Sequence, residues 1–334
     1  MPDDILLHIL ACLNDTKYAV QTSVLSKRWR HLWTSVQDLY FHRKSFGRDS
    51  SFHYFVRAVL DDPRRLNCRV DRFWYYANPE TTVLTQLTSY ALSRGARELV
   101  IASHSYFANT ILPDLSSGSS SLETLHVVEQ LYIHRSSFGH SMLRLTSLQL
   151  RWVRTTSGSF GGCFDIFNIF PILTNLSLSW CYLGGANLKI TGPKIFSLKL
   201  DDVTDVGLLE LSLPNLEVFE YCFTRDYGEV DDFWLINLPS LRHADLNVDP
   251  GGLYKCHHRL LKVLQGICNL ESLVINLQAL NESGLLENQT SPFRNLKSLK
   301  LRSPYLSHPI VPATIKNYFT GGTQYSQDMD FEFV

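Results

Sequence analysis

A short leucine-spaced motif at residues 172–183 is the feature that most limits how this chain can fold. It reads ILTNLSLSWCYL, and its apolar side chains follow the spacing L-x-x-L-x-L-x-x-C-x-L. Because side chains alternate along a strand, this spacing puts the leucines on one face of a short strand before the chain turns. One such unit cannot bury its own apolar face, so the chain must contain further copies that stack on it.

Ten copies occur between residues 70 and 302. They follow one another at intervals of 21 to 29 residues, which is the range of leucine-rich repeats. Their first apolar residues are Val70, Ala96, Leu122, Leu145, Leu173, Ile195, Leu216, Leu241, Leu270 and Leu296. We therefore predict an α/β fold, a leucine-rich-repeat solenoid shaped as a horseshoe, over residues 70–302.

The composition excludes several classes of function. The 334 residues carry a formal net charge of −1, which gives no overall attraction to nucleic acid or to an anionic membrane. The chain contains no run of about 18 apolar residues, and Asp3 and Asp4 stand where a secretory signal would be positive. Seven cysteines without C-x-x-C spacing suit a reducing compartment. We expect an intracellular protein, in the cytoplasm, the nucleus or both, with neither nucleic acid nor membrane as partner.

The first 36 residues predict three short helices. Pro2 and two acidic residues suit a first helical turn, and the apolar residues that follow recur at helical spacing. A second apolar set follows, and Ser26 can cap a third helix. A unit of this size has more apolar surface than it can bury internally, so we expect it to bind a partner protein.

Two strings in this region, PDDILLHIL and AVQTSVLSKRWRHLW, resemble the F-box motif of plant F-box proteins with leucine-rich repeats. The run VLSKRWRHLW, from Val24 to Trp33, is the specific part. The resemblance continues through FHYFVRAVL, WYYA and ALSRGARELVI. It implies that the F-box binds the Skp-type adaptor of an SCF-type cullin-RING ubiquitin ligase. It also implies that the repeats select a protein substrate for ubiquitination, with no catalysis by this chain.

Ten residues of the F-box are expected to form the adaptor-binding surface. They are Pro2, Ile5, Leu6, Ile9, Leu10, Val20, Val24, Leu25, Trp29 and Trp33. The family motif usually opens with Leu-Pro preceded by several residues, whereas Met1 directly precedes Pro2 here. A second hypothesis therefore stays open, in which a truncated F-box leaves a leucine-rich-repeat scaffold or receptor that does not recruit the ligase.

The chain is expected to divide into four parts: a small all-helical F-box that caps the N-terminus (1–40), a helical linker and cap (41–69), the solenoid (70–302) and a C-terminal cap (303–334). Helical spacing appears again at 52–60, at 82–94 before Gly95, and at 257–267. The Gly-rich segments 157–162 and 250–252 are predicted loops, and 327–334 alternates as a strand does.

Strand alternation also predicts which side chains line the concave face of the solenoid. They are the residues between the leucines, among them Glu98, Val100, His126, Ser177, Lys199, Glu220, Cys222 and Asp245. The face mixes both signs of charge, which favours a folded protein or peptide as partner. The residues expected to bind substrate are Trp74, Tyr76, Arg151, Trp152, Trp180, Phe223, Lys300 and Arg302.

Three of these residues, Trp152, Trp180 and Phe223, stand seven positions after the start of their repeats. They fit either stacking between repeats or an aromatic anchor for a partner. For catalysis the best cluster is Cys256, His257 and His258, but adjacent residues rarely converge on one metal. Phosphate-binding, dinucleotide-binding and hydrolase motifs are absent from the sequence. We therefore expect no enzyme activity, no metal and no cofactor.

Overall fold

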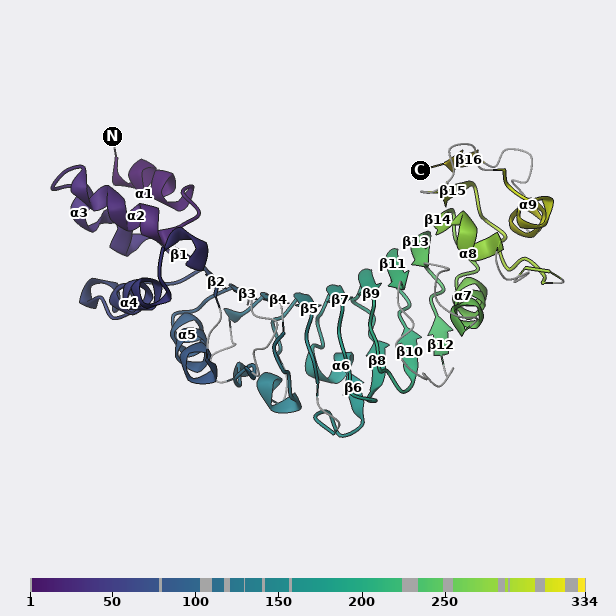
Figure 1. Ribbon diagram of the computed structural model, residues 1–334, viewed down its shortest axis with the longest axis horizontal. Helices are drawn as coiled ribbons and strands as arrows, with labels where there is room; N and C mark the ends of the chain where they lie inside the picture. The colour runs from purple at the N-terminus through teal and green to yellow at the C-terminus, as the bar shows by residue number, and fades with distance from the viewer. Residues whose placement is uncertain are drawn as a thin grey trace. The chain divides into compact units, whose positions relative to one another are not determined.

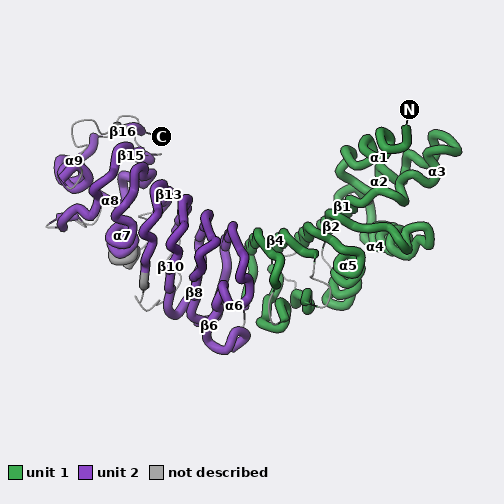
Figure 2. Tube along the Cα trace, turned by 180° about the vertical axis from the view of Figure 1, so that it is seen from behind, with its two compact units in different colours: residues 1–154 green, residues 155–334 purple. Residues whose placement is uncertain are grey.

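The computed structural model divides the chain into two compact units, Met1–Arg154 and Thr155–Val334 (Figure 2). It describes residues 2–333 apart from 78–79, 103–109, 117–120, 129, 140–141, 156–157, 224–233, 249–254, 282–285, 288, 304–309 and 322–329. The chain is mixed α/β, with an N-terminal helical region followed by parallel sheet (Figure 1).

The N-terminal helical region has the three expected helical segments. They are α1 (Asp3–Ala11), α2 (Thr16–Gln21) with the 3-10 turn η1 (Thr22–Val24), and α3 (Trp29–Leu32) with the 3-10 turn η2 (Trp33–Ser35). Asp3 and Asp4 lie in the first turn of α1, where the helix dipole favours acids. The Asp15 carboxylate caps α2 by accepting from the amide of Lys17 at 2.8 Å. The predicted helical character of this region is confirmed.

Five parallel strands follow in the first unit, in the spatial order β1-β2-β3-β4-β5. They are β1 (Asp38–His42), β2 (Arg72–Tyr76), β3 (Glu98–Ala102), β4 (Thr124–Val128) and β5 (Ser147–Arg151). Helix α4 (Asp49–Leu60) lies between β1 and β2 in the chain, and helix α5 (Thr81–Ser93) lies between β2 and β3. Both helices were predicted, and Gly95 has the left-handed φ of +81° expected just after α5.

The second unit contains two parallel sheets (Figure 1). The larger has the order β7-β9-β11-β13-β14-β15-β16. Its strands are β7 (Asn175–Ser179), β9 (Ser197–Asp201), β11 (Val218–Phe223), β13 (His243–Val248), β14 (Ser272–Asn276), β15 (Ser298–Arg302) and β16 (Asp330–Phe333). Strand β16 confirms the alternation seen at the end of the sequence, and it pairs with β15.

The smaller sheet, of order β12-β10-β8-β6, was not predicted. It consists of β6 (Cys163–Asp165), β8 (Asn187–Thr191), β10 (Leu209–Ser212) and β12 (Trp234–Asn237). The helices of this unit are α6 (Ile166–Ile169), α7 (Lys255–Gly266), α8 (Leu277–Asn281) and α9 (Ala313–Thr320). Helix α7 confirms the helical spacing of 257–267. Residues 158–162 form a turn, as predicted, and 250–252 lie outside the described residues.

The repeat spacing read from the sequence fixes the strands of the main sheets. Each of the ten predicted first residues is at most 2% exposed, and a strand begins two positions after every one of them. The third and fifth positions after the first apolar residue are also buried in every repeat, as Leu176 and Leu178 are in β7. Paired strands keep these positions in register, so Leu176 lies beside Leu198 and Leu178 beside Leu200. The buried side chains thus form continuous columns.

Strand β1 was missed because its first residue was assigned to the N-terminal helices. Val36 is buried and the strand begins two positions later, as in the ten repeats. Leu39 and Phe41 then occupy the buried positions, and Phe41 packs on Phe73 of β2 with ring centroids 5.6 Å apart. The expected boundary at residue 40 therefore falls inside a strand.

Two side chains expected to be accessible are buried instead: Val100, expected on the open face opposite the leucines, and Phe223, expected just past its strand. Val100 is 4% exposed because its register neighbours Trp74 and His126 flank it with large rings. Phe223 is 5% exposed because β11 runs one residue longer than its neighbour β9, and alternation puts Phe223 on the same face as Phe219. The expectation that Phe223 lines an open surface is wrong.

The register makes a direct prediction about stability. Replacing Leu176 by Ala should cost about 2 to 5 kcal/mol of unfolding free energy, because it leaves a cavity in a packed column. Replacing its half-buried neighbour Ser177 by Ala should change stability by no more than about 0.5 kcal/mol. Urea denaturation of the two variants tests this. Equal losses would show that the inward and outward positions of β7 have been exchanged.

Candidate functional site

The N-terminal helical region exposes a concentration of apolar side chains. Six of the 16 large hydrophobic residues that are exposed in the described part of the chain fall within its first 25 residues. Val24 is 86% exposed, Leu25 64% and Ile5 49%, and Ile9 lies one helical turn from Ile5 on the same face of α1. Leu13 and Tyr18 are also exposed and were not in the predicted set. This concentration of exposed apolar side chains makes the region a candidate interaction surface.

The ten predicted F-box residues do not all lie on this surface. Leu6, Leu10 and Trp33 are buried: Leu6 and Leu10 form the inward stripe of α1, and Trp33 is a buried residue of η2. These three can only support the surface from below. Of the others, Val20 and Trp29 are half-buried, and Pro2 is exposed with Ile5, Ile9, Val24 and Leu25.

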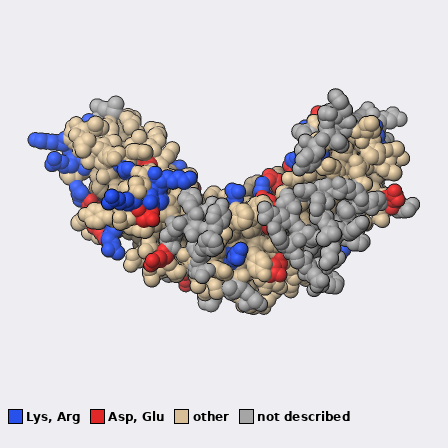
Figure 3. Space-filling view, viewed as in Figure 1, with Lys and Arg blue, Asp and Glu red and all other residues tan. Residues whose placement is uncertain are grey.

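A basic depression adjoins Val24. Its lining includes Lys27, Arg30, His31 and Arg64 together with apolar Val20 and Val24. Figure 3 shows Lys and Arg side chains gathered at the end of the molecule that carries the N-terminal helices. The exposed surface of this region is thus apolar with a positively charged border.

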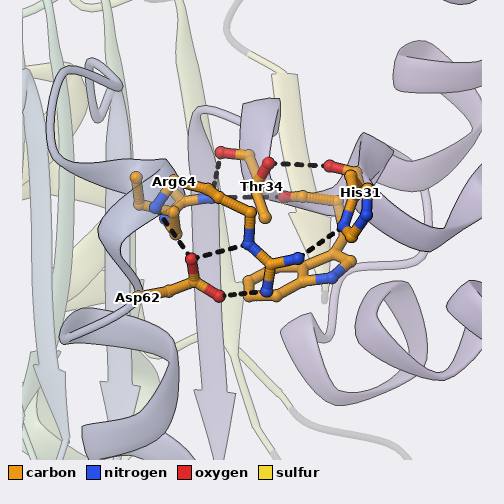
Figure 4. Close-up of polar contacts among 6 residues, drawn as sticks. His31, Thr34, Asp62 and Arg64 are labelled. Atoms are coloured by element: carbon orange, nitrogen blue, oxygen red, sulfur yellow. Dashed lines mark hydrogen bonds and ion pairs between the residues drawn. The ribbon is translucent and has the colours of Figure 1, made fainter.

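Arg64 belongs to the turn η4 (Pro63–Arg65) and lies at this positively charged border (Figure 4). Its guanidinium donates to both carboxylate oxygens of Asp62, at 2.9 and 2.6 Å, and also contacts the ring of His31. The hydrogen bond from Arg64 holds the pKa of Asp62 below its ordinary value. Asp62 also caps the turn by accepting from the Arg64 amide at 2.9 Å. The sequence signal for this turn was Asp62 followed by Pro63, a common start of a helical turn.

The neighbouring Arg65 is fully buried and ties the turn to the end of the helical region. Its guanidinium donates to the backbone carbonyls of Trp33, Thr34 and Val36 at 3.2, 2.9 and 2.9 Å. Thr34 in turn donates to the carbonyl of His31 at 2.7 Å (Figure 4). One buried cation therefore satisfies three carbonyls just before β1.

This arrangement predicts unequal roles for two adjacent arginines. Arg65→Met should destabilise the chain by about 3 kcal/mol or more, because three buried carbonyls lose their donor. Arg64→Met should cost no more than about 1 kcal/mol, since that side chain is about half exposed. Thermal unfolding of both variants measures the difference, and comparable losses would contradict the role assigned to Arg65.

The open face of the first unit's sheet is aromatic. Trp74 donates its indole N–H to Glu98 at 2.8 Å, and the ring of Tyr76 stacks on His42 with centroids 4.7 Å apart. Tyr40, across from Trp74, is buried, and its pKa is raised to about 12 chiefly by that burial. Arg151, at the end of β5, is exposed.

The open face of the second unit's larger sheet is charged and largely paired. Lys199 lies 2.8 Å from Glu220 on the next strand, and Lys300 lies 2.7 Å from Glu332. Arg302 donates to Asp245 at 2.6 Å across the intervening β14, and this bond raises the pKa of Arg302. Burial raises the pKa of Cys222, at the end of β11, to about 12, so its thiol is protonated at neutral pH.

Trp152 and Trp180 each follow a strand directly, after β5 and β7 respectively. Both are half-buried and have left-handed backbone, with φ of +58° and +56°. Such φ values are uncommon for side chains of this size, so the surrounding fold must hold them. The sequence predicted that both tryptophans stand at the same position of their repeats, but it did not predict their left-handed backbone conformation.

Among the described residues, no group of three or more His, Cys, Asp or Glu side chains could hold a metal ion. The side chains of Cys256, His257 and His258 lie outside those that the structure describes. In the same described part of the chain, no helix is long and apolar enough to span a membrane.

Comparison with known proteins matches residues 1–40 to the F-box domain. F-box/LRR-repeat protein At5g02910 of Arabidopsis thaliana is 26% identical over 325 residues, which cover 89% of this chain and 63% of that protein. F-box/LRR-repeat protein At1g06630 of the same plant is 27% identical over 307 residues, covering 83% of this chain and 70% of that protein. Across eight Arabidopsis relatives, the chain spans 52% to 71% of the relative's own length.

The residues that match the F-box domain thus include the helices that expose the apolar surface. Over most of its length it is similar to plant F-box/LRR-repeat proteins. The resemblance found in the sequence is confirmed.

Proposed function

We propose that this protein is the substrate-recognition subunit of an SCF-type cullin-RING ubiquitin ligase. Its F-box would bind a Skp-type adaptor, and through it a cullin, while residues 70–302 form a leucine-rich-repeat solenoid that binds a protein substrate. The chain itself is non-catalytic in this proposal, takes no cofactor, and works in the cytoplasm, the nucleus or both. The observation that carries the proposal is the exposed apolar surface on helices that match the F-box domain.

The proposed adaptor surface is narrower than the one read from the sequence. It consists of Pro2, Ile5, Ile9, Val24 and Leu25 with the half-buried Val20 and Trp29. Leu13 and Tyr18 extend it, and the basic depression borders it. An isolated apolar side chain on a surface needs no explanation, but six within 25 residues form a patch that a stable complex would cover.

The double variant Ile9→Asp, Val24→Asp should abolish adaptor binding, because it buries two charges against an apolar partner. Both side chains are exposed, so the fold should survive the change. The measurement is co-purification with a Skp-type adaptor, combined with circular dichroism. Tyr54→Asp, on the exposed side of α4, is the matched control and should bind normally. Unchanged adaptor binding by the folded double variant would refute the proposed surface.

The substrate surface is proposed on the open faces of the two units. Trp74, Tyr76 and Arg151 contribute to it in the first unit, and Lys300 and Arg302 in the second. Trp152 and Trp180 contribute from the positions directly after their strands. Phe223 is removed from the set because it is buried.

Trp180 tests whether these tryptophans bind substrate or support the repeats. If Trp180 is an anchor, Trp180→Ala should weaken substrate capture by about 2 kcal/mol or more while the melting temperature stays nearly constant. Phe196→Ala, also a large and partly exposed ring, is the control. A lower melting temperature, with normal capture by the folded fraction, would mean that Trp180 is structural.

A further inference from the structure

The central column of open-face residues differs in kind between the two units. In the second unit this column runs through Ser177, Lys199, Glu220, Asp245, Val274, Lys300 and Glu332, and its five charged residues are all in ion pairs. In the first unit the register-matched residues are Tyr40, Trp74, Val100, His126 and Gln149. The column of the first unit therefore consists mostly of rings, whereas that of the second unit consists mostly of paired charges.

The rings of the first unit hold one another in place. Trp74 meets Tyr40 edge to face, with centroids 4.9 Å apart and planes at 89°, and it meets Tyr76 at 6.1 Å and 71°. Tyr76 is stacked on His42. Trp74 and Tyr76 are only half-buried, so part of each ring remains open to a ligand. Rings fixed in this way lose little conformational freedom when a ligand binds.

A carboxylate lies beside these rings. Glu98 accepts from the Trp74 indole through Oε1, and it forms no ion pair with any described Lys or Arg. Its register neighbour Arg72 is already bound to Asp38 at 2.6 Å and lies over the ring of Tyr40, 5.8 Å from the centroid. Two carboxylates thus face one guanidinium, and the cluster has a net charge of −1.

His126 does not supply the missing cation. It stands two strands from Trp74 in the same register column, and burial lowers its pKa below the ordinary value. The imidazole is therefore mostly neutral at pH 7. The negative charge of Glu98 remains available to a bound molecule.

We infer that Glu98, Trp74 and Tyr76 form a subsite for an arginine side chain of a bound protein segment. This inference rests on the proposed function, of which it specifies the substrate chemistry in the first unit. A cation over an aromatic face is attracted by the negative charge of the ring, and tryptophan gives the strongest attraction. A guanidinium is planar and weakly hydrated, so it can stack on a ring while it donates to a carboxylate. Glu98 provides that carboxylate at the edge of the rings.

The probe is a library of blocked, otherwise uncharged dodecapeptides, each made twice, with arginine or with the neutral analogue citrulline at the centre. Binding to the purified 334-residue chain is measured by fluorescence anisotropy at low ionic strength. The tightest-binding arginine peptides should bind about 5- to 30-fold more tightly than their citrulline versions. Equal binding of the two versions, or no binding by either across the library, would overturn the inference.

Glu98→Gln removes the charge but keeps an oxygen that can accept from the Trp74 indole. It should reduce the preference for arginine to less than about twofold, with the melting temperature unchanged. Glu220→Gln, on the open face of the second unit, is the matched control and should leave the preference intact. If the preference for arginine over citrulline persists in Glu98→Gln, the arginine binds at another site. The same conclusion holds if the preference is lost equally in Glu220→Gln.

The peptide measurement needs no adaptor, so it separates this inference from the proposed function. Adaptor binding without any arginine preference would overturn the subsite alone. An arginine preference in a chain that binds no adaptor would support the subsite and contradict the ligase role.

Discussion

The in-register pairing of parallel strands is the constraint on which the rest of this structure depends. Pairing between Leu176 and Leu198, and between Leu178 and Leu200, repeats along both units with other apolar side chains. Because strand periodicity is two, the same pairing also puts the intervening residues into columns on the opposite face. Burial of the leucines therefore determines which side chains lie together on the opposite face of the sheet.

The repeating part of the fold could be predicted from the sequence. Ten strands each begin two residues after the predicted first residue of a repeat. Strand β1 was missed because Val36 also fits the helical spacing before it. The smaller sheet was missed because its strands are short, only three residues in β6, and lie between the strands of the larger sheet in the sequence. Their positions depend on packing between repeats, which no local pattern records.

The residues of the candidate sites could be predicted only so far as strand periodicity assigns each side chain to one face of the sheet. It placed Trp74 and Lys300 correctly on the open side, but it could not foresee that rings at Trp74 and His126 would cover Val100. Nor could it show that Glu98 forms no ion pair among the described residues, because this depends on Arg72 pairing with Asp38. Pairing preferences among neighbouring charges are decided by three-dimensional geometry.

Strand β1 has a mechanical consequence for the first unit. It begins three residues after the last turn of the helical region and is hydrogen-bonded to β2, while Arg65 clamps the carbonyls of Trp33, Thr34 and Val36. The F-box helices are therefore built into the first strand of the sheet, with no flexible tether between them. A protein held on those helices and a segment held near Glu98 would therefore both be bound by the same compact unit.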